Sequence, residues 1–179
     1  MNLSYTVTSS IEELQQIIHL QQSNLPSSIC EEEKEAEGFV TVQHDLEILK
    51  KMHDYEPHII VKDEGKIVGY ALSMVSDFKT DIEVLKPMFE KIELLLDGQT
   101  SYLVMGQICI DKAYRKQGMF RGLYYKMRDE FMHKYDLLIT EVAANNTRSM
   151  QAHYAIGFSD LLVYEADGFT WHLIQWNWK

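Results

Sequence analysis

The chain has 179 residues, of which 46% are hydrophobic and 25% are charged, and its formal net charge is -10 at pH 7. This length predicts one domain, residues 1–179, with a core large enough to fold without metals or disulfides, and the acidic charge argues against nucleic acid or an anionic membrane as a partner. The first residues, MNLSYTVTSS, lack the basic and apolar regions of a signal peptide, and no apolar run approaches about 20 residues. We therefore expect a cytoplasmic protein without a membrane span.

Strand and helix patterns alternate in the first part of the chain. Ser10 and Glu13 occupy the N-cap and capping-box positions of a helix, and Asp45 is suited to cap a second one. The tetrapeptide DEGK predicts a hairpin turn, with Gly65 where φ is positive. In chain order, the elements are a strand over 3–8, a helix reaching residue 22, an irregular segment over 24–39 with the acidic run EEEKEAE, a helix over 45–52, and strands over 58–62 and 66–75.

In the second part of the chain, Pro87 fixes where the first helix can begin, because proline fits only the first turn. The helix is therefore predicted to start near Lys86 and to end at Leu96. The elements that follow are a strand over 102–110, a helix over 119–135, a strand over 137–142, a helix over 147–156 ended by Gly157, and a strand pair over 161–165 and 169–178 that turns at ADG. This order predicts a mixed α/β fold.

The stretch ICIDKAYRKQGMFRG combines an apolar strand, a basic loop with one glycine and the beginning of a helix. Backbone N–H groups and the positive end of the helix dipole at such a junction bind phosphate groups. Gly65-Lys66 is not followed by Ser or Thr, so there is no Walker A motif, and no GxGxxG occurs. The loop is thus either a pyrophosphate site or a basic surface turn.

Two segments together carry a resemblance to a known family. YRKQGMFRG resembles the acetyl-CoA loop, [Q/R]-x-x-G-x-[G/A], of the GNAT superfamily of N-acetyltransferases, and NTRSMQAHYAIGF is similar to the helix that follows it there. The resemblance covers nearly the whole chain and is strongest over 102–158. It implies an α/β (α+β) fold with a central mixed, mostly antiparallel sheet, flanked by helices and splayed at the acetyl-CoA cleft.

The resemblance also implies which residues bind acetyl-CoA. The backbone of Ile108, Cys109 and Ile110 would pair with the pantetheine arm as an added strand does. The pyrophosphate would be wrapped mainly by backbone N–H groups of the loop, namely those of Lys116, Gln117, Gly118, Met119, Phe120 and Arg121, with Arg115 at the first motif position. Phe120 departs from the family's second Gly or Ala, but it falls in the first helical turn, where a side chain is tolerated.

The second motif assigns two more residues. Counting back from Gly157, Asn146 is the motif asparagine, expected near the pantetheine or the acetyl end, and His153 replaces the family's frequent proton-donor tyrosine. An imidazole can protonate a departing thiolate near neutral pH, but His153 can equally be a hydrogen-bonded helix residue without a chemical role. Tyr154 lies about 100° further round the helix and cannot simply replace it.

Glu141 is the candidate general base, because some relatives carry a glutamate at this place on the strand. An alkylammonium with a pKa near ~10.4 becomes nucleophilic only after it loses a proton. Glu141 could instead be a solvated or paired strand residue. Gln107 and Asp111 are weaker candidates that could hold a water molecule.

The predicted function is transfer of an acetyl group from acetyl-CoA directly to a primary amine, either a small amine or a protein amine, in a ternary complex. The alternatives are a non-catalytic acetyl-CoA sensor of the same fold and another nucleotide-binding enzyme. No metal is expected, because the histidines lack metal-ligand spacing, and Cys30 and Cys109 form no CxxC pair. The tryptophans near the C-terminus are read as sheet core or as contacts of a homodimer.

Overall fold

The structure is a computed structural model that describes residues 2–25, 40, 42–82, 85–96, 98–166 and 168–179. Two features singled out in the sequence, Cys30 and the acidic run over 31–37, lie outside the described residues. Among the described helices, none is long and apolar enough to cross a membrane.

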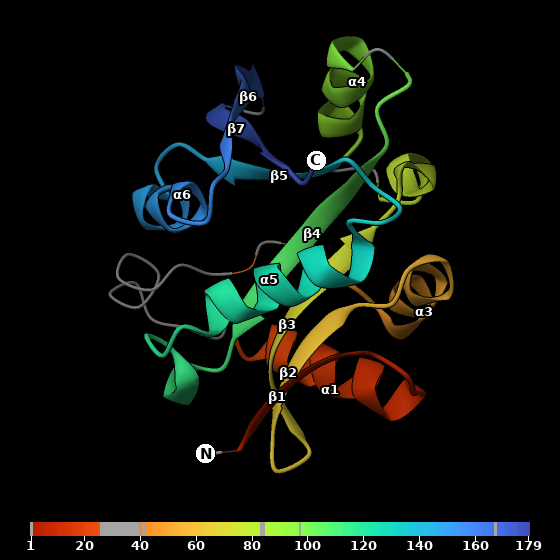
Figure 1. The fold of residues 1–179 in the computed structure, drawn as a ribbon, viewed down its shortest axis with the longest axis vertical. Coiled ribbons are helices and arrows are strands. Elements are labelled where there is room, and N and C mark those ends of the chain that lie inside the picture. The colour runs from red at the N-terminus through yellow and green to blue at the C-terminus, as the bar shows by residue number, and fades with distance from the viewer. Residues whose placement is uncertain (1, 26–39, 41, 83–84, 97, 167) are drawn as a thin grey trace. The chain divides into compact units, whose positions relative to one another are not determined.

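Seven strands form a mixed sheet in the order β1-β2-β3-β4-β5-β7-β6, coloured along the chain in Figure 1. Four neighbouring pairs are antiparallel, and β4 with β5 is parallel. The strands are β1 (Leu3–Val7), β2 (Ile59–Asp63), β3 (Lys66–Met74), β4 (Tyr102–Ile110), β5 (Leu137–Ala143), β6 (Ser159–Ala166) and β7 (Phe169–Asn177). The predicted mixed, mostly antiparallel sheet is confirmed, and β4 has the predicted bounds.

Five α-helices are described, namely α1 (Ile11–Gln22), α3 (Leu46–Tyr55), α4 (Lys86–Leu95), α5 (Met119–Phe131) and α6 (Thr147–Tyr154). The side chains of Ser10 and Asp45 cap α1 and α3 as predicted. Glu13 departs from the capping box, because its carboxylate accepts from the backbone N–H of Ser9 at 2.6 Å and also pairs with Lys62. A salt bridge to the sheet thus replaces part of the local cap.

Two helices end earlier than their apolar spacing predicts. Helix α5 ends at Phe131 because the N–H groups of Lys134 and Tyr135 both turn back to the Phe131 carbonyl. Helix α6 ends at Tyr154, and Gly157, with φ +124°, donates to the carbonyls of His153 and Tyr154. Apolar periodicity continues past a helix end when the next residues still face the core. A 3-10 helix, η1 (Ser76–Thr80), was not predicted.

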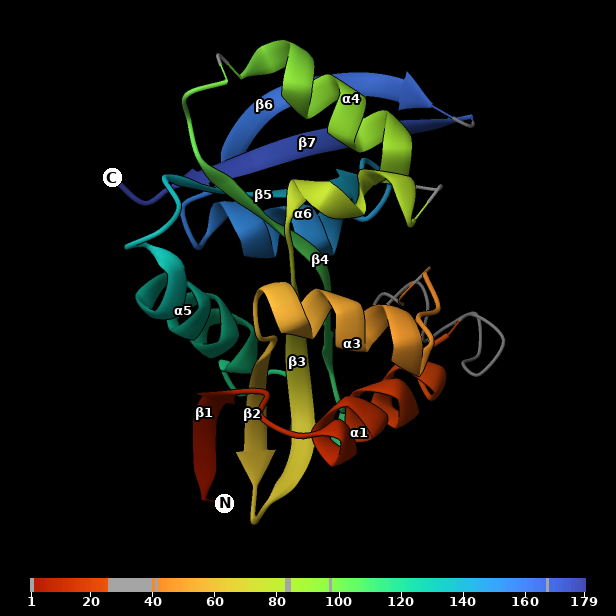
Figure 2. The ribbon, with the colours of Figure 1, turned by 90° about the vertical axis from the view of Figure 1, so that its right-hand side faces the viewer.

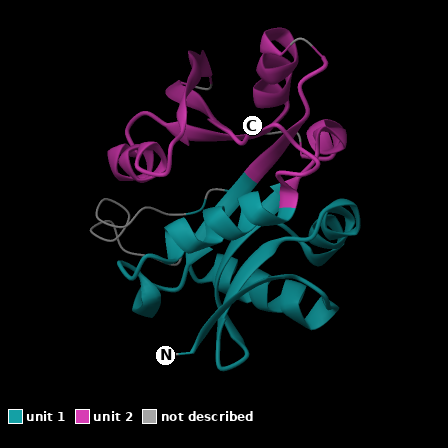
Figure 3. Cartoon of the chain, in the orientation of Figure 1, with its two compact units in different colours: residues 1–73, 106–130 teal, residues 74–105, 131–179 magenta. Residues whose placement is uncertain are grey.

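The chain divides into two compact units, shown in different colours in Figure 3, and each is described by itself. The first unit contains residues 1–73 and 106–130. In it, α1 and α3 pack together on the sheet face that carries Lys62, whose ammonium pairs with Glu13 of α1. Helix α5 packs against Tyr5 of β1, which is level with Val61 and so on the opposite face.

The second unit contains residues 74–105 and 131–179. Helices α4 and α6 cover opposite faces of its β5-β7-β6 strands, as Figures 1 and 2 show. On the α6 side, Phe158 stacks near Trp176, and Trp176 in turn meets Trp178 edge-on. Both tryptophans are buried, so they belong to the core of this unit, which is one of the two readings that the sequence left open.

Candidate functional site

The loop between β4 and α5 has an unusual backbone. Lys116 and Gly118 both adopt positive φ, +63° and +81°, a region that non-glycine residues seldom occupy. A Cβ built on Gly118 would meet no described atom within 4 Å, so glycine is needed there for its conformation rather than for lack of space. A positive φ at a non-glycine residue occurs at ligand-binding sites and in tight turns, and Glu64 of the β2–β3 turn, with φ +49°, is an example of the second kind.

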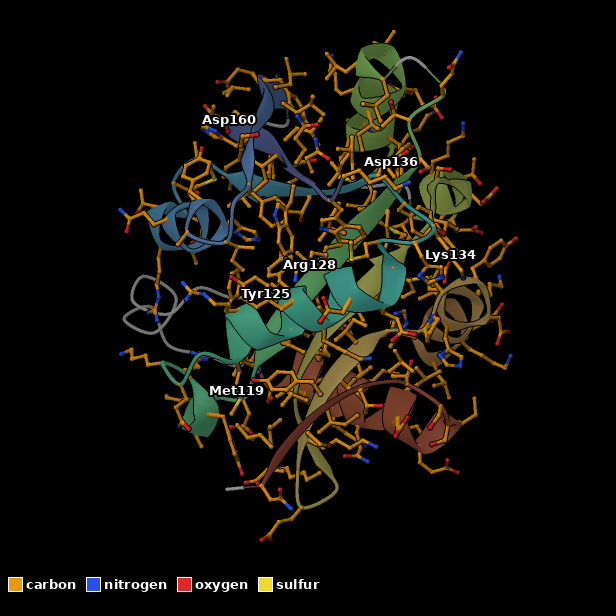
Figure 4. All side chains as sticks on the ribbon, viewed as in Figure 1. Met119, Tyr125, Arg128, Lys134, Asp136 and Asp160 are labelled. Carbon is orange, nitrogen blue, oxygen red and sulfur yellow. The ribbon has the colours of Figure 1, made fainter. Side chains whose placement is uncertain are left out.

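Helix α5 begins at Met119, immediately after this turn, at the position labelled in Figure 4. The amide of Gly122 donates to the Gly118 carbonyl at 3.1 Å and closes the first helical turn. The N–H groups of that turn point along the axis towards the loop, where the helix dipole is positive. Lys116 and Arg121 are exposed, so cationic side chains border the helix start. The arrangement suits an anion such as pyrophosphate.

Arg115 closes the loop at its base. Its Nε donates to the Ile110 carbonyl at 3.1 Å, and its Nη2 bonds to the side-chain oxygen of Asn24, which follows α1. The guanidinium therefore fixes the shape of the loop through protein contacts. Sequence reasoning placed Arg115 at the first motif position but could not foresee Asn24, which is 91 residues away.

The turn before the loop is anchored to the β2–β3 hairpin. Asp111 caps the short helix η3 (Lys112–Tyr114) by accepting from the N–H of Ala113 at 3.0 Å. Tyr114 donates its hydroxyl to Asp63 at 3.0 Å. These contacts engage Asp111 in loop structure, which weakens the case for it as a holder of catalytic water.

Gly122 is a residue of this region that sequence reasoning missed. A Cβ there would lie 2.4 Å from the Tyr5 ring, so only glycine lets α5 approach β1 so closely. Its place one turn after Gly118 is the signal that could have identified it. The close approach fixes the position of the α5 N-terminus relative to the sheet.

Strand β4 continues well past its pairing with β5. The ladder with β5 contains three pairs and ends at Val104 opposite Ile139. The hydroxyl of Thr140 then donates to the Met105 carbonyl at 2.9 Å, so a side chain replaces the next ladder bond. The last residues of β4, Ile108 to Ile110, thus lie beyond this ladder, as an added pantetheine strand would require. Burial raises the pKa of the Cys109 thiol to about 12, which makes it an inert apolar side chain.

Gln107 belongs to a buried hydrogen-bond network in the first unit. Its Oε1 accepts from Gln21 at 2.8 Å and from Tyr70 at 2.6 Å, while its Nε2 donates to the Val42 carbonyl at 2.8 Å. His44 bonds to Gln21 in the same network, and burial lowers its pKa to about 4. Because these contacts commit its carboxamide to the fold, Gln107 is poorly suited to hold a reacting water.

Glu141 follows Thr140 on β5 and is half-buried. Loss of solvent raises the pKa of its carboxyl to about 7, against a smaller opposing effect from a hydrogen bond with Tyr164. A carboxylate with this pKa is a much stronger base than an exposed glutamate and remains largely ionised just above neutral pH.

His153 and Asn146 both serve the structure of α6. The carboxamide oxygen of Asn146 caps the helix by accepting from the N–H of Ser149 at 3.1 Å. His153 is 1% exposed, its Nδ1 donates to the Ser149 carbonyl at 2.7 Å, and its ring packs edge-on against Phe158. Burial lowers its pKa to about 4. A neutral buried imidazole favours the structural reading.

The predicted residues fall into two groups. Ile108 to Ile110 and Arg115 to Arg121 are in the first unit, and Glu141, Asn146 and His153 are in the second. Within the described part of the chain, no group of three or more metal-ligating side chains gathers.

Comparison with known families identifies the class of protein. The profile of the Acetyltransferase (GNAT) family matches residues 14–158, most of the chain. The chain therefore belongs to this family, whose members use acetyl-CoA as the acetyl donor. A search of curated proteins found no match.

Solved structures share the fold at low sequence identity. The ribosomal-protein-S18-alanine N-acetyltransferase from Escherichia coli is 15% identical, with a TM-score of 0.65 over 98% of this chain and 94% of its own. A second structure is yncA from Salmonella typhimurium with its cofactor acetyl-CoA, which is 12% identical, with a TM-score of 0.67 over 100% of this chain and 95% of its own. A third is Ard1 from Thermoplasma volcanium, which is 11% identical, with a TM-score of 0.67 over 99% of this chain and 98% of its own. The predicted GNAT fold is confirmed.

The residues present fit acetyl-CoA. The positive-φ turn at Gly118 and the start of α5 offer backbone N–H groups and positive charge to a pyrophosphate. The end of β4 extends beyond its ladder with β5, where an amide-bearing arm can pair.

Proposed function

We propose that this protein transfers the acetyl group of acetyl-CoA directly to a primary amine, and that its two units act as one domain, residues 1–179. The observation that carries the proposal is the half-buried carboxyl of Glu141, with a pKa of about 7, in a chain that also has the acetyl-CoA loop. The family profile spans parts of both units, which supports one domain.

In this proposal, the loop binds the donor. Backbone N–H groups over 116–121 hold the pyrophosphate, Arg115 keeps the loop in shape, and the backbone of Ile108 to Ile110 pairs with the pantetheine arm. Asn146 lies near the acetyl end. When bound, acetyl-CoA supplies an acetyl thioester, which a neutral amine can attack without a covalent enzyme intermediate.

Glu141 takes the proton from the amine. Moving a proton from an ammonium with a pKa of ~10.4 to an ordinary glutamate is unfavourable by about 8 kcal/mol, and to a carboxyl with a pKa of about 7 by about 5 kcal/mol. Burial thus makes Glu141 a better base, and we expect activity to rise with pH through 7. The thiolate leaves without an obligatory acid, so His153 is the weaker candidate for a catalytic role.

The acceptor is a small amine or a protein amine. The Escherichia coli neighbour is named for acetylating an alanine of ribosomal protein S18, which supports a protein N-terminus as one acceptor to test. Helix α4 is proposed to border the acceptor, because its Lys91 lies 5.8 Å from the centre of the ring of Tyr164, on the sheet face that also carries Glu141.

A panel of amines tests the proposal. Purified protein, acetyl-CoA and each of a set of small amines, amino acids and N-terminal peptides are combined, and free thiol release is followed. We expect release that requires one class of amine, with intersecting double-reciprocal plots, as direct transfer in a ternary complex demands. Acetyl-CoA binding without thiol release for any amine would contradict the proposal and favour a sensor.

A further inference from the structure

Asn24 follows α1 and is fixed at the C-terminal end of that helix by several hydrogen bonds. Its backbone N–H donates to the Gln21 carbonyl at 2.9 Å, and its side-chain Nδ2 donates to the Leu20 carbonyl at 2.8 Å. Its own carbonyl accepts from the N–H of Val40 at 3.3 Å. Asn24 is 5% exposed. Because Nδ2 is committed to the helix end, the carboxamide has one orientation, in which Oδ1 is directed to Arg115.

The guanidinium of Arg115 connects Asn24 to the end of β4. Its Nη2 donates to Oδ1 of Asn24, and its Nε donates to the Ile110 carbonyl at 3.1 Å. Arginine presents its donors in a rigid planar fork, so two bonds in different directions fix the whole side chain. One charged group therefore joins the end of α1, the end of β4 and the loop that binds the donor in the proposed function. All three belong to the first unit, coloured teal in Figure 3.

The Ile110 carbonyl lies on the edge of β4 that faces away from β3, here called the open edge. The N–H of Asp111 donates to the Val68 carbonyl of β3 at 2.8 Å. The C=O and N–H of a trans peptide point in opposite directions, so the Ile110 carbonyl of the same peptide group points away from β3. The backbone groups of Ile108, two residues earlier, share this direction. Arg115 thus lies across the end of the open edge.

We propose that Asn24 is a positioning residue for acetyl-CoA, which acts by holding the Arg115 guanidinium across the end of the open edge. The pantetheine arm then pairs with Ile108 and with the N–H of Ile110, whose carbonyl is bonded to Arg115. The fixed positive charge lies where the arm would pass from the strand to the loop. The inference rests on the proposed function for its ligand, but the contact between Asn24 and Arg115 can be tested without any ligand.

The physical advantage of the contact is preorganisation. A long, flexible cationic side chain loses conformational freedom when a ligand orders it, and this loss weakens binding. The bond to Asn24 orders Arg115 in the folded protein before any ligand arrives. Without Asn24, the guanidinium keeps one attachment, the Ile110 carbonyl, and the beginning of the loop gains freedom that binding must remove.

The first test follows the Nε–H of Arg115 by nitrogen–proton NMR in the full chain without ligand, with the signal assigned by Arg115→Lys. The exchange of this hydrogen with water reports how often its bond to the Ile110 carbonyl opens. We expect exchange to be roughly tenfold faster in Asn24→Ala than in wild type, because the guanidinium is then held at one point. An unchanged exchange rate would overturn the proposal.

Ser23→Ala is the matched control. The Ser23 hydroxyl donates to the same Leu20 carbonyl as Asn24 does, at 2.8 Å. The variant therefore loosens the same helix end but leaves the bond from Arg115 to Asn24 in place. We expect the wild-type exchange rate for Nε–H. If exchange were as fast as in Asn24→Ala, a general loosening of the helix end would explain both results, and the proposal would fail.

The second test measures acetyl-CoA binding by titration calorimetry. We expect Kd to rise roughly tenfold in Asn24→Ala and to stay at the wild-type value in Ser23→Ala. Asn24→Asp should bring Kd back to within about twofold of wild type, since one carboxylate oxygen can accept from Arg115 and the other from the Ser23 hydroxyl. A wild-type Kd in Asn24→Ala, or no recovery in Asn24→Asp, would contradict the proposal.

Arg115→Lys leaves the end of α1 intact and so decides the question even if Asn24→Ala does not fold. An ammonium keeps the charge but lacks the fork that reaches Asn24 and Ile110 together, and we expect a Kd roughly tenfold above wild type. Adding Asn24→Ala to this variant should raise Kd by less than about twofold more, because the contact is already broken. A wild-type Kd in Arg115→Lys, or fully additive effects, would overturn the proposal.

Turnover with a working acceptor separates positioning from loss of folded protein. In Asn24→Ala, the KM for acetyl-CoA should rise about tenfold, while kcat and the KM of the acceptor stay near wild type. A lower kcat with an unchanged KM would show a merely structural role and overturn the proposal. If no amine releases thiol, the proposed transfer fails, while hydrogen exchange and calorimetry still decide the role of Asn24.

Discussion

The loop over 115–121 and the surroundings of Glu141 would serve the proposed reaction by different physical means. The loop acts through exposed backbone, with Gly118 at φ +81° and the first turn of α5 after it. Glu141 acts through a side chain whose pKa is raised to about 7 by burial. Backbone recognition depends on local sequence and helix geometry, whereas a shifted pKa depends on residues that pack from several elements. Recognition by the loop should therefore tolerate changes elsewhere in the protein, whereas the pKa of Glu141 should respond to changes in the residues packed around it.

A charged substitution in the loop tests the first part of this comparison, the binding of acetyl-CoA by the loop backbone. Gly118→Asp adds a carboxylate beside the proposed pyrophosphate site, and we expect roughly a hundredfold loss of acetyl-CoA affinity. A ligand at 100 times its Kd stabilises a protein by about 2.7 kcal/mol, so most of this stabilisation should vanish. The melting temperature with and without acetyl-CoA measures this stabilisation in each protein.

Gly65→Asp is the matched control for this variant. Gly65 also has positive φ, +86°, with no described atom within 4 Å of an added Cβ, but it lies in the β2–β3 turn. It should share the conformational strain and keep the response to acetyl-CoA. Equal responses in the two variants would place the cofactor elsewhere.

Removing the Glu141 carboxylate tests the second part of this comparison, the effect of burial on its pKa. The folded-state pKa of Glu141, about 7, lies above the ordinary 4.5, so the folded protein binds more protons between these values and loses stability as pH rises through them. Glu141→Gln removes this loss. We expect the variant to be more stable than wild type by roughly 3 kcal/mol at pH 8 and nearly equal to it at pH 4.5. Urea unfolding at both pH values measures it, and a variant less stable than wild type at pH 8 would contradict the burial account.

His153 extends the comparison to a buried base in the same unit. Burial lowers the pKa of His153 from 6.5 to about 4 in the folded protein. As pH falls below 6.5, the unfolded chain therefore binds a proton at this residue before the folded protein does. Stability is therefore fully present above pH 6.5 and is lost towards pH 4, by about 2 kcal/mol at pH 5 from this group. The imidazole C–H resonance should show no titration above pH 5. A midpoint near 6.5 would instead restore His153 as a candidate proton donor.

Gly122 tests how tightly the loop is tied to the sheet. Gly122→Ala places a methyl group 2.4 Å from the Tyr5 ring and should destabilise the fold by roughly 1 kcal/mol as the ring shifts. In a Tyr5→Ala background the clash is absent, so the better helix propensity of alanine should make the same change neutral or stabilising. Denaturant midpoints of wild type, Gly122→Ala, Tyr5→Ala and the double variant measure these effects. If the effects of the two substitutions simply add, the contact between residue 122 and the Tyr5 ring is not tight.

The sequence predicted what local patterns determine. Strand β4, the N-caps Ser10 and Asp45 and the start of α4 all follow from spacing within one or two turns. The ends of α5 and α6 did not, because the apolar pattern runs on into the turns that close them.

Contacts distant in sequence could not be predicted in the same way. The bond from Arg115 to Asn24 and the network of Gln107 depend on the strand order and register, which no local pattern contains. The turn signal ADG does predict the last strand pair, and β6 pairs with β7 as expected. Nothing local places β7 beside β5.

The pH dependence of kcat in wild type and in Glu141→Gln, with one acceptor from the amine panel, tests the central claim most directly. Wild-type kcat should rise along one limb with a midpoint near 7 and then level off. In Glu141→Gln it should be lower by roughly 10²–10⁴-fold at pH 7 and climb with pH without levelling, because solvent then removes the proton. A Glu141→Gln enzyme with wild-type turnover and an unchanged limb would contradict the account.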